Sequence, residues 1–398
     1  MRHWLGWALG ALMTLVGSAH FGCGDAERPP PLAAPDPAPS TGGSLVDPEA
    51  PEPVLESPCG AATVALEFVR PNLYFTIDAS GSMLEAIPAG TPNADVPFPP
   101  GDRYGALALA IETLLRRIGH RVKYGARLFP SGDAQCDIGE EVMTLTNGDS
   151  VSFAVSGEVG PVLRELMFEI RRRTPRGATP VAQALSGTLG SVQNQAEDTY
   201  VFLVTDGAPN CNLTTSCSID RCIPNIEHAL LTEQFVCDDS VNCCEPGLYG
   251  PENCLDDAGS LAAVQDLAGQ GVRTVVIGIP GSDAYSDLLD ELALAGGLPR
   301  AGSPSYYRVN DAEELTTTLG ALGLEVALSC TIELVEAPPD PTLVNVYFDR
   351  QLVPADPVDG WTFIAPQTVQ IVGQSCSLMQ AGQVLQADIV AGCPVVIQ

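Results

Sequence analysis

The sequence predicts an α/β fold, a doubly wound and mostly parallel sheet flanked by helices, followed by a small C-terminal antiparallel β module. Apolar runs of strand length alternate with helix-like segments through residues 59–328, which is typical of a parallel sheet covered on both faces. Two of these runs, Val201–Val204 and Val275–Ile279, show no polar alternation, as a strand buried on both faces requires. Residues 329–398 alternate polar and apolar with period two and show no clear helical window, so we expect antiparallel strands there.

Each element of the sheet region follows from its local pattern. Asp102 stands where an N-cap is expected before an apolar period of helical type, and Pro180 stands at the first position of a later helix, where its missing N–H costs nothing. The predicted helices span residues 102–118, 159–172, 180–195, 261–269, 285–295 and 312–328. The predicted strands span residues 73–78, 123–130, 151–155, 199–207, 272–279 and 305–309.

The N-terminal segment indicates export. Residues 1–23 have the pattern of a signal peptide, with Arg2 before an apolar stretch that is short for a membrane-spanning helix. Cys23 is then followed by residues 24–58, a linker with ten prolines and no hydrophobic period. We therefore predict a cell-envelope lipoprotein anchored by a lipid on Cys23, in the outer membrane, facing the periplasm or at the cell surface. Ordinary signal cleavage is the alternative.

Thirteen cysteines in an exported chain indicate disulfide bonds. If Cys23 carries the lipid, twelve remain, and we expect them to pair within two groups. Seven of them lie in a long insertion at residues 208–258, where zinc binding is the alternative, although no pair of CxxC motifs occurs. The group expected at one edge of the sheet is Cys136, Cys211, Cys217, Cys222, Cys237, Cys243, Cys244 and Cys254, and the group expected near the domain base and the C-terminal module is Cys59, Cys330, Cys376 and Cys393.

Charge and residue content argue against several classes of function. The net charge of −30 disfavours nucleic acid as a partner, because such binding needs a basic surface. Behind the signal, His120 and His228 are the only histidines, and the sequence gives neither of them a triad partner or a G-x-S-x-G elbow. Lys123 is the only lysine, and no phosphate-binding G-x-x-x-x-G-K-[ST] loop occurs. We therefore expect a protein that is not an enzyme.

Five oxygen-bearing side chains lie at the ends of predicted strands or just before a predicted helix. Asp78, Ser80 and Ser82 follow the first strand, Asp206 follows a later buried strand, and Thr179 precedes a helix. Doubly wound sheets bind their ligands at the carboxyl ends of the strands. Hydroxyls and carboxylates are the hard donors that Mg²⁺ prefers, and the lack of His and Cys in the set disfavours zinc. The sequence therefore predicts a Mg²⁺ site, with Mn²⁺ or Ca²⁺ as alternative ions.

The same residues resemble the signature of von Willebrand factor type A domains, the integrin I-like family. The stretch DASGS at residues 78–82 looks like the Asp-x-Ser-x-Ser motif of that family. Thr179 matches the family's threonine and Asp206 its later Asp-Gly pair, and all three features occur in family order. The resemblance covers about residues 68–328 and implies a type A domain there. A single lysine beside 18 arginines, with abundant Ala, Gly and Pro, indicates a bacterial genome, so we expect a type A domain of a bacterial cell envelope.

The resemblance also implies a role for each side chain and a partner for the ion. Because the two carboxylates stay outside the direct ligands, the ion keeps much of its charge and accepts an acidic side chain from a partner protein. Such a MIDAS-type site acts in protein binding and cell adhesion. The residues that would bind the metal directly are Ser80, Ser82 and Thr179, and those that would act through water are Asp78 and Asp206.

The insertion at residues 208–258 departs from the family, since connections in such folds are short. It directly follows Asp206, so we expect it beside the metal edge, either as a partner-specific rim or as a stapled surface loop. A second hypothesis is a structural envelope scaffold, in which this loop or the β module makes the contacts and the metal site is only structural. In the module, we expect Trp361 in the core rather than on a sugar-binding surface.

Overall fold

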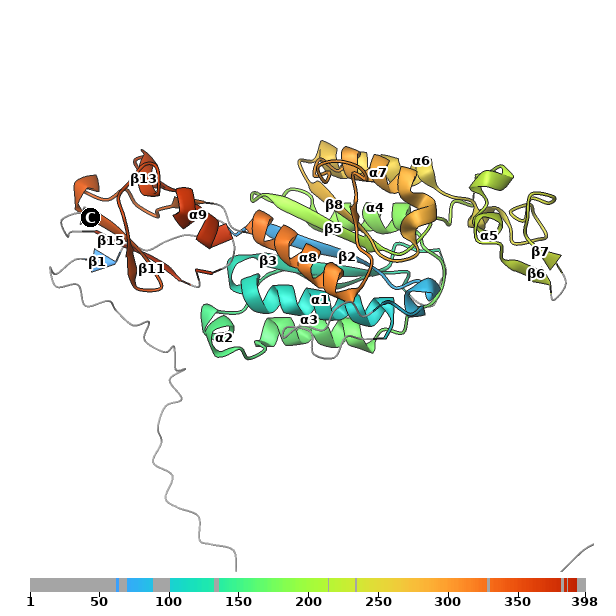
Figure 1. Ribbon diagram of the computed structural model, residues 1–398, viewed down its shortest axis with the longest axis horizontal. Helices are drawn as coiled ribbons and strands as arrows, with labels where there is room; N and C mark the ends of the chain where they lie inside the picture. The colour runs from blue at the N-terminus through green and yellow to red at the C-terminus, as the bar shows by residue number, and fades with distance from the viewer. Residues whose placement is uncertain are drawn as a thin grey trace, which may run out of the picture. The chain divides into compact units, whose positions relative to one another are not determined.

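The computed structural model describes the sheet region, the cysteine-rich insertion and most of the C-terminal region (Figure 1). The described residues are 62–63, 70–88, 101–131, 136–213, 215–232, 235–327, 330–380, 383–384 and 386–391. The predicted signal, the proline-rich linker, Cys23, Cys59 and Cys393 lie outside these residues, so what we expect of them stays a prediction. None of the helices in the described part of the chain has the length and apolar character needed to cross a bilayer.

A six-stranded sheet forms the centre of the region between residues 70 and 327 (Figure 1). Its strands are β2 (Asn72–Asp78), β3 (Lys123–Phe129), β4 (Glu140–Asn147), β5 (Thr199–Thr205), β8 (Arg273–Gly278) and β9 (Tyr307–Arg308). They lie in the order β4-β3-β2-β5-β8-β9, and every neighbouring pair is parallel except β3 and β4. The central strands β2 and β5 are buried along their whole length, as expected of strands covered on both faces.

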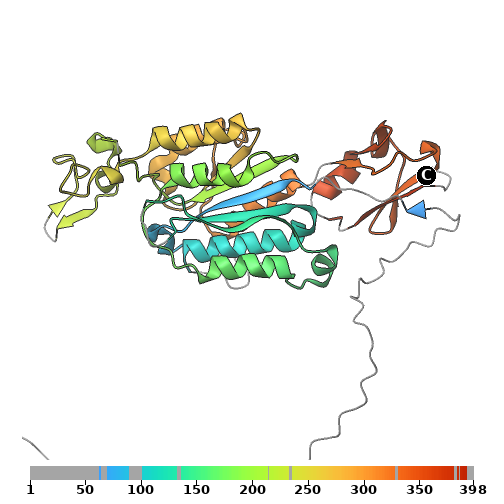
Figure 2. The same cartoon turned by 180° about the vertical axis from the view of Figure 1, so that it is seen from behind.

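Helices cover both faces of this sheet (Figures 1 and 2). One face carries α1 (Arg103–Ile118), α3 (Pro161–Arg172) and α8 (Ala312–Ala327), and the other carries α4 (Val181–Val192), α6 (Asp257–Gly269) and α7 (Ser286–Ala295). Alternate side chains of β2 serve the two layers, since Leu73, Phe75 and Ile77 pack in the first cluster and Tyr74 packs in the second. The predicted doubly wound α/β class is therefore confirmed.

Some local predictions are wrong. Residues 151–155, predicted as a strand, form the helix α2 (Val151–Ser156), which Gly157 closes at φ 73°, a left-handed conformation that favours glycine. Periodicity alone does not separate strand from helix in so short an apolar run. The prediction also misses the edge strand β4, because most of its side chains are polar and only partly buried. Pro180 is the N-cap of α4 rather than its first residue.

The described residues after 330 form two antiparallel sheets with Ala62–Thr63. One sheet has the order β1 (Ala62–Thr63), β15 (Ala387–Ala391), β11 (Val344–Phe348), β12 (Gln351–Val353), and the other has the order β10 (Thr331–Glu333), β14 (Thr368–Val372), β13 (Gly360–Ala365). They share a buried cluster that includes Trp361, whose Nε1 donates a 3.2 Å hydrogen bond to Val353 O. Trp361 thus packs in a core, as expected.

Two features of this region differ from the predictions. A helix, α9 (Gly373–Gln380), follows β14 where the sequence shows no helical window, and its Cys376 is bonded to Cys330. The predicted boundary at residue 59 assigns Ala62–Thr63 to the first domain, whereas in the structure these residues pair with β15. Both differences concern short segments whose partners are distant in sequence. Short 3₁₀ helices outside the insertion are η1 (Gly81–Leu84), η2 (Gly119–Arg121), η5 (Ser282–Tyr285) and η6 (Pro341–Leu343).

Candidate metal centre

Two neighbouring parallel strands bring two aspartates to one edge of the sheet. Asp78 is the last residue of β2, and Asp206 directly follows β5. The register pairs Ile77 with Val204, and one step further the Thr205 hydroxyl donates a hydrogen bond of 2.6 Å to Asp78 Oδ2. Both aspartates are almost completely buried, at 0% and 1% exposure. The fold therefore holds two carboxylates where water reaches them poorly.

Asp78 fixes the loop that follows it. Ser80 N donates a hydrogen bond of 2.8 Å to Asp78 Oδ1, so both carboxylate oxygens have a protein donor. Burial, together with the charge of Asp206, raises the pKa of Asp78 to about 7. Burial also raises the pKa of Asp206, although its hydrogen bonds with Arg103 and Ser82 oppose that change. A cation at this edge would stabilise both ionised carboxylates.

Ser80, Ser82 and Asp206 form a chain of oxygen atoms. Ser80 Oγ lies 3.1 Å from Ser82 Oγ, and the Ser82 hydroxyl donates a hydrogen bond of 2.9 Å to Asp206 Oδ1. Neighbouring ligands of an octahedral Mg²⁺ ion are about 3 Å apart, since each lies about 2.1 Å from the ion. The two serine oxygens have this spacing. Because the Ser82 hydroxyl donates its hydrogen to Asp206, the Ser80 hydroxyl must donate to Ser82 Oγ, and each serine oxygen keeps a lone pair for an ion, so the donor set fits a hard divalent cation.

The loop before α4 holds Thr179 beside these residues. Gly81 N donates a 3.0 Å hydrogen bond to Gly177 O, which joins this loop to the DASGS loop. Thr179 N donates to Asn210 Oδ1 at 2.8 Å, and Asn210 N donates to Thr179 O at 3.0 Å. Ser80, Ser82 and Asp206 are therefore in hydrogen-bond contact, whereas Thr179 is held near them through the backbone of its loop.

Two residues of this edge are missed by the sequence analysis. Arg103, the first residue of α1, places Nη1 2.6 Å from Asp206 Oδ2, and Asn210 anchors Thr179. One feature of the sequence could have indicated that Arg103 has a carboxylate partner. A cation in the first turn of a helix opposes the helix dipole, so its presence there indicates a carboxylate partner.

The three predicted segments thus meet at the carboxyl ends of parallel strands, in a sheet with one antiparallel edge strand. This is the arrangement that the resemblance to von Willebrand factor type A domains implies. The candidate site consists of the loops after β2 and β5 and the loop before α4. The cysteine-rich insertion begins directly after Asp206.

No protein-family model and no curated protein matches the chain. Among solved structures, it is similar to the pilus adhesin SpaC from Lactobacillus rhamnosus GG, with 14% identity over 83% of this chain and 40% of that chain and a TM-score of 0.43. It is also similar to the vWF domain of the pili tip protein Mfa5 from Porphyromonas gingivalis, with 13% identity over 67% of this chain and 96% of that chain and a TM-score of 0.40. It is similar as well to the manganese-loaded TRAP protein from Plasmodium vivax, with 17% identity over 74% of this chain and 82% of that chain and a TM-score of 0.36. The chain thus spans about two fifths of the length of SpaC.

Disulfide bonds hold the insertion together. Its elements are short: η3 (Ile219–Arg221), α5 (Ile223–Ile226), β6 (Leu230–Thr232), β7 (Phe235–Val236) and η4 (Pro251–Asn253). All eight cysteines of the predicted first group are bonded within that group, as Cys136–Cys211, Cys217–Cys254, Cys222–Cys244 and Cys237–Cys243. The first of these bonds joins the loop after β3 to the start of the insertion, next to Asn210. The insertion is thereby tied to the edge that carries the site.

The zinc alternative does not fit the insertion. Within the described residues, one group brings three Cys, His, Asp or Glu ligand atoms within 4.8 Å of one another, namely Cys217, Cys244 and Cys254. All three are in disulfide bonds, so no thiolate is available to a metal. The three cysteines are therefore no candidate for a metal site, and the oxygen donors at the sheet edge remain the candidate that the sequence predicts.

Proposed function

We propose that this chain is a metal-ion-dependent protein-binding module of the cell envelope. A divalent cation, Mg²⁺ in the first place, would be held by Ser80, Ser82 and Thr179 and would accept a carboxylate from a partner protein. The observation that carries this proposal is the contact chain from Ser80 through Ser82 to Asp206. Export, and anchoring by a lipid on Cys23, belong to the same proposal.

The hydrogen bonds of the two aspartates explain why the cation would remain attractive to an anion. Asp78 has donors on both oxygens, from Ser80 N and Thr205, and Asp206 has donors on both oxygens, from Ser82 and Arg103. Carboxylates committed in this way favour contact with the ion through water. Three neutral hydroxyls would then be its direct protein ligands, and they neutralise none of its charge. A partner carboxylate supplies the missing negative charge.

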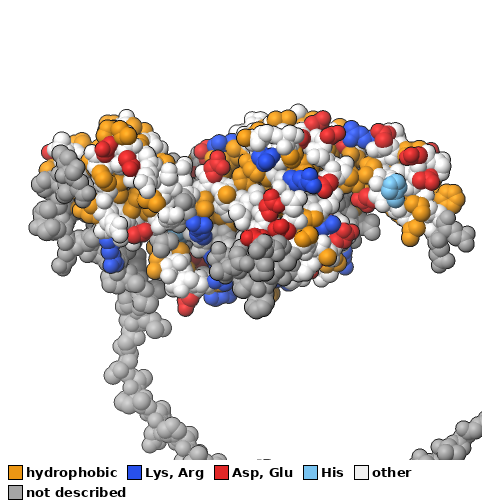
Figure 3. All heavy atoms as spheres, viewed as in Figure 1, with side chains coloured by type: hydrophobic (Ala, Val, Ile, Leu, Met, Phe, Trp, Pro, Cys, Tyr) orange, Lys and Arg blue, Asp and Glu red, His pale blue; other side chains and the backbone are white. Residues whose placement is uncertain are grey.

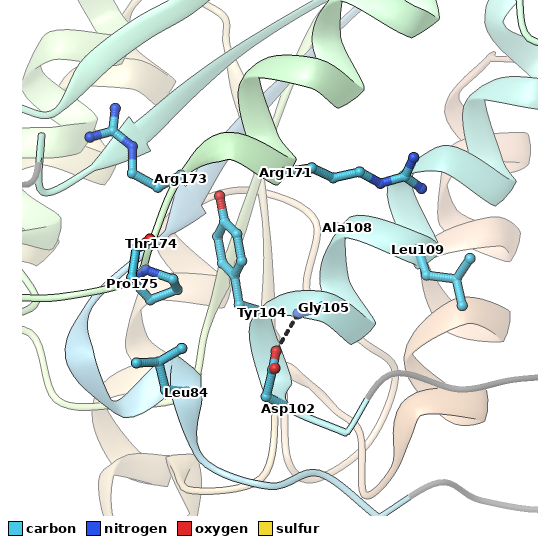
Figure 4. A pocket seen from close by; sticks show the side chains of 10 residues that line it. All are labelled: Leu84, Asp102, Tyr104, Gly105, Ala108, Leu109, Arg171, Arg173, Thr174 and Pro175. Carbon is cyan, nitrogen blue, oxygen red and sulfur yellow. Dashed lines mark hydrogen bonds between the residues drawn. The ribbon is translucent and has the colours of Figure 1, made fainter. Parts of the chain in front are cut away.

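The surface beside the site carries a run of arginines. A hollow of about 490 Å³ lies next to the DASGS loop, with Leu84, Tyr104 and Asp102 in its wall and Arg171 and Arg173 on its rim (Figure 4). Arg171 pairs with Glu112 and Arg173 with Glu140. These arginines belong to the run RRRTPR at residues 171–176, which leads into the Thr179 loop. The run gathers four of the 19 basic residues of a chain with net charge −30. On the face shown in Figure 3, acidic and basic side chains are interspersed.

The experiment that tests the proposal is capture of partners from the organism's own envelope. The mature chain, immobilised in Mg²⁺, is expected to retain a partner that EDTA releases and that the Asp78→Ala variant fails to retain. Added Mn²⁺ should restore retention by the wild type after EDTA treatment. A partner that stays bound in EDTA, and that binds the variant equally well, would exclude metal-dependent docking.

One observation favours the second candidate function, a scaffold whose insertion makes the contacts. The hairpin of β6 and β7 exposes Leu230, Phe235 and Val236 at 65%, 53% and 41%, and Figure 3 shows apolar side chains in the part of the chain where Figure 1 labels these strands. Exposed apolar groups on a disulfide-bonded hairpin are typical of contact surfaces. This function predicts binding that survives Ser80→Ala and is lost on reduction, whereas metal docking predicts that Ser80→Ala alone abolishes binding.

The arginine run gives a prediction about the rate of binding. Arg172→Gln is expected to slow association with the captured partner by about two- to fivefold at low salt and to leave dissociation unchanged, because an exposed charge near the site mainly steers encounter. The Arg172 side chain is 53% exposed and pairs only with Glu169 of its own helix among the ion pairs of the described residues, so its loss disturbs little. Association rates measured by surface plasmon resonance at 50 and 500 mM salt should converge at the higher salt.

The matched control for this prediction is Arg164→Gln. Arg164 lies on the same helix, about 12 Å along its axis from Arg172, and donates to Val159 O at 2.8 Å. The Arg164→Gln variant should associate with the partner as fast as the wild type does. If both variants slow association equally, the slower association results from the change in net charge and not from the position of Arg172 near the site.

A further inference from the structure

Arg103 is placed where a cation is normally disfavoured. It begins α1 directly after the N-cap Asp102, so the helix dipole opposes its charge. Its side chain is only 10% exposed. A buried charge at this end of a helix needs strong partners, and the site supplies them.

The partners of Arg103 are groups of the metal centre itself. Nη1 lies 2.6 Å from Asp206 Oδ2 and donates at 3.2 Å to Ser82 O, and Nη2 lies 2.7 Å from Glu85 Oε2. Asp206 therefore has one oxygen on Arg103 and the other on the Ser82 hydroxyl. Each oxygen of Asp206 thus already accepts from a protein donor, and these two contacts on opposite oxygens restrain the orientation of the carboxylate.

The loop after β8 leaves room for this guanidinium. At Gly281, with φ 114°, a Cβ atom would lie 2.7 Å from Asp206 O and 3.0 Å from Arg103 Nη1. A larger residue would thus push both the aspartate backbone and the arginine out of place. The loops after β2, β5 and β8 therefore enclose the Arg103–Asp206 pair. Three separate segments of the chain thus fix the position of this pair at the sheet edge.

We propose that Arg103 is a built-in counter-ion of the metal centre, which holds Asp206 away from the cation and keeps the site assembled when no cation is bound. This inference rests on the proposed metal site. A fixed positive charge within a few ångströms repels a divalent cation, so Arg103 weakens metal binding. It also keeps two buried carboxylates from facing each other without a counter-charge. Arg103 is accordingly a positioning residue that sets how tightly the site holds its ion.

The test is calorimetric titration of the mature chain with Mg²⁺ and with Mn²⁺. Arg103→Met and Arg103→Gln, which remove the charge, are expected to bind the cation about 10- to 100-fold more tightly than the wild type. In EDTA, these two variants should also have a lower Tm than the wild type, and added cation should raise their Tm by more than it raises that of the wild type. Arg103→Lys keeps the charge and should bind within about threefold of the wild type. Structural damage weakens metal binding, so tighter binding separates a counter-ion from a merely structural arginine.

The matched control is Arg116→Met on the same helix, whose side chain pairs with Glu112 and is 42% exposed; it should leave the affinity unchanged. If the wild type binds the cation and the two charge-removing variants bind it equally or more weakly, the counter-ion role is wrong and the metal site stands. If neither the wild type nor these variants bind Mg²⁺ or Mn²⁺, the metal site and the counter-ion role are both wrong.

Discussion

Asp78→Asn is expected to abolish the stabilisation of this protein by Mg²⁺ while leaving the fold intact. Asparagine has the shape of aspartate and can still accept from Ser80 N, and the Thr205 hydroxyl can accept from its amide. The variant lacks the negative charge of the Asp78 carboxylate, which a bound cation would need. At a concentration 100 times its Kd, a cation that binds only the folded chain stabilises it by about 2.7 kcal/mol. The wild type should therefore gain several degrees in Tm from Mg²⁺, and the variant should gain none.

The same measurement has an internal control in Asp149→Asn. Asp149 accepts hydrogen bonds of 2.9 Å from Val162 N and Leu163 N at the start of α3, so its neutral variant should lower the Tm. It lies outside the metal centre and should keep the full shift with Mg²⁺. An undiminished shift in Asp78→Asn would show that Mg²⁺ binds elsewhere.

The second large effect is expected in the insertion. Cys222→Ala combined with Cys244→Ala should unfold the insertion locally while the sheet stays folded. The insertion's own buried cluster consists of five cysteines, with only partly buried neighbours such as Leu231 and Tyr249 around them, so apolar packing within this cluster is weak. Ile223 and Leu255 pack instead against the core of the sheet region. The lost bond spans 22 residues, and closing a loop of that size contributes about 3 kcal/mol. Hydrogen exchange and limited proteolysis should show new accessibility confined to residues 215–254.

The control for that experiment removes a disulfide bond elsewhere in the chain. Cys330 and Cys376, 46 residues apart, link the C-terminal region, and their double alanine variant should leave the insertion protected. Protection of the insertion that survives the loss of Cys222 and Cys244 would mean that its remaining contacts suffice. Such a result would also weaken the scaffold function, which needs the insertion to depend on its disulfides.

The features that were predictable from the sequence are those that one stretch of chain encodes by itself. β2 and β5 follow from unbroken apolar runs, and α1 follows from its period and from Asp102. Arg103 was not predictable in this way, because its partner Asp206 lies 103 residues further along the chain. The same reason left the disulfide pairs open, since their spacings run from 6 to 75 residues and eight cysteines allow 105 connectivities. Contacts between residues that are far apart in the sequence produce no local sequence pattern from which they could be predicted.

The hydrogen bond from Thr205 to Asp78 joins residues that are 127 positions apart. During synthesis or export from the N-terminus, the DASGS loop emerges long before β5 exists to complete it. Parallel strands that distant pair late, because the chain must first lose the entropy of a long loop. A chain in which these strands have not yet paired therefore lacks the pair of neighbouring carboxylates. If the proposed site binds a cation, the chain would acquire metal affinity only when β2 and β5 have paired and the central sheet has closed.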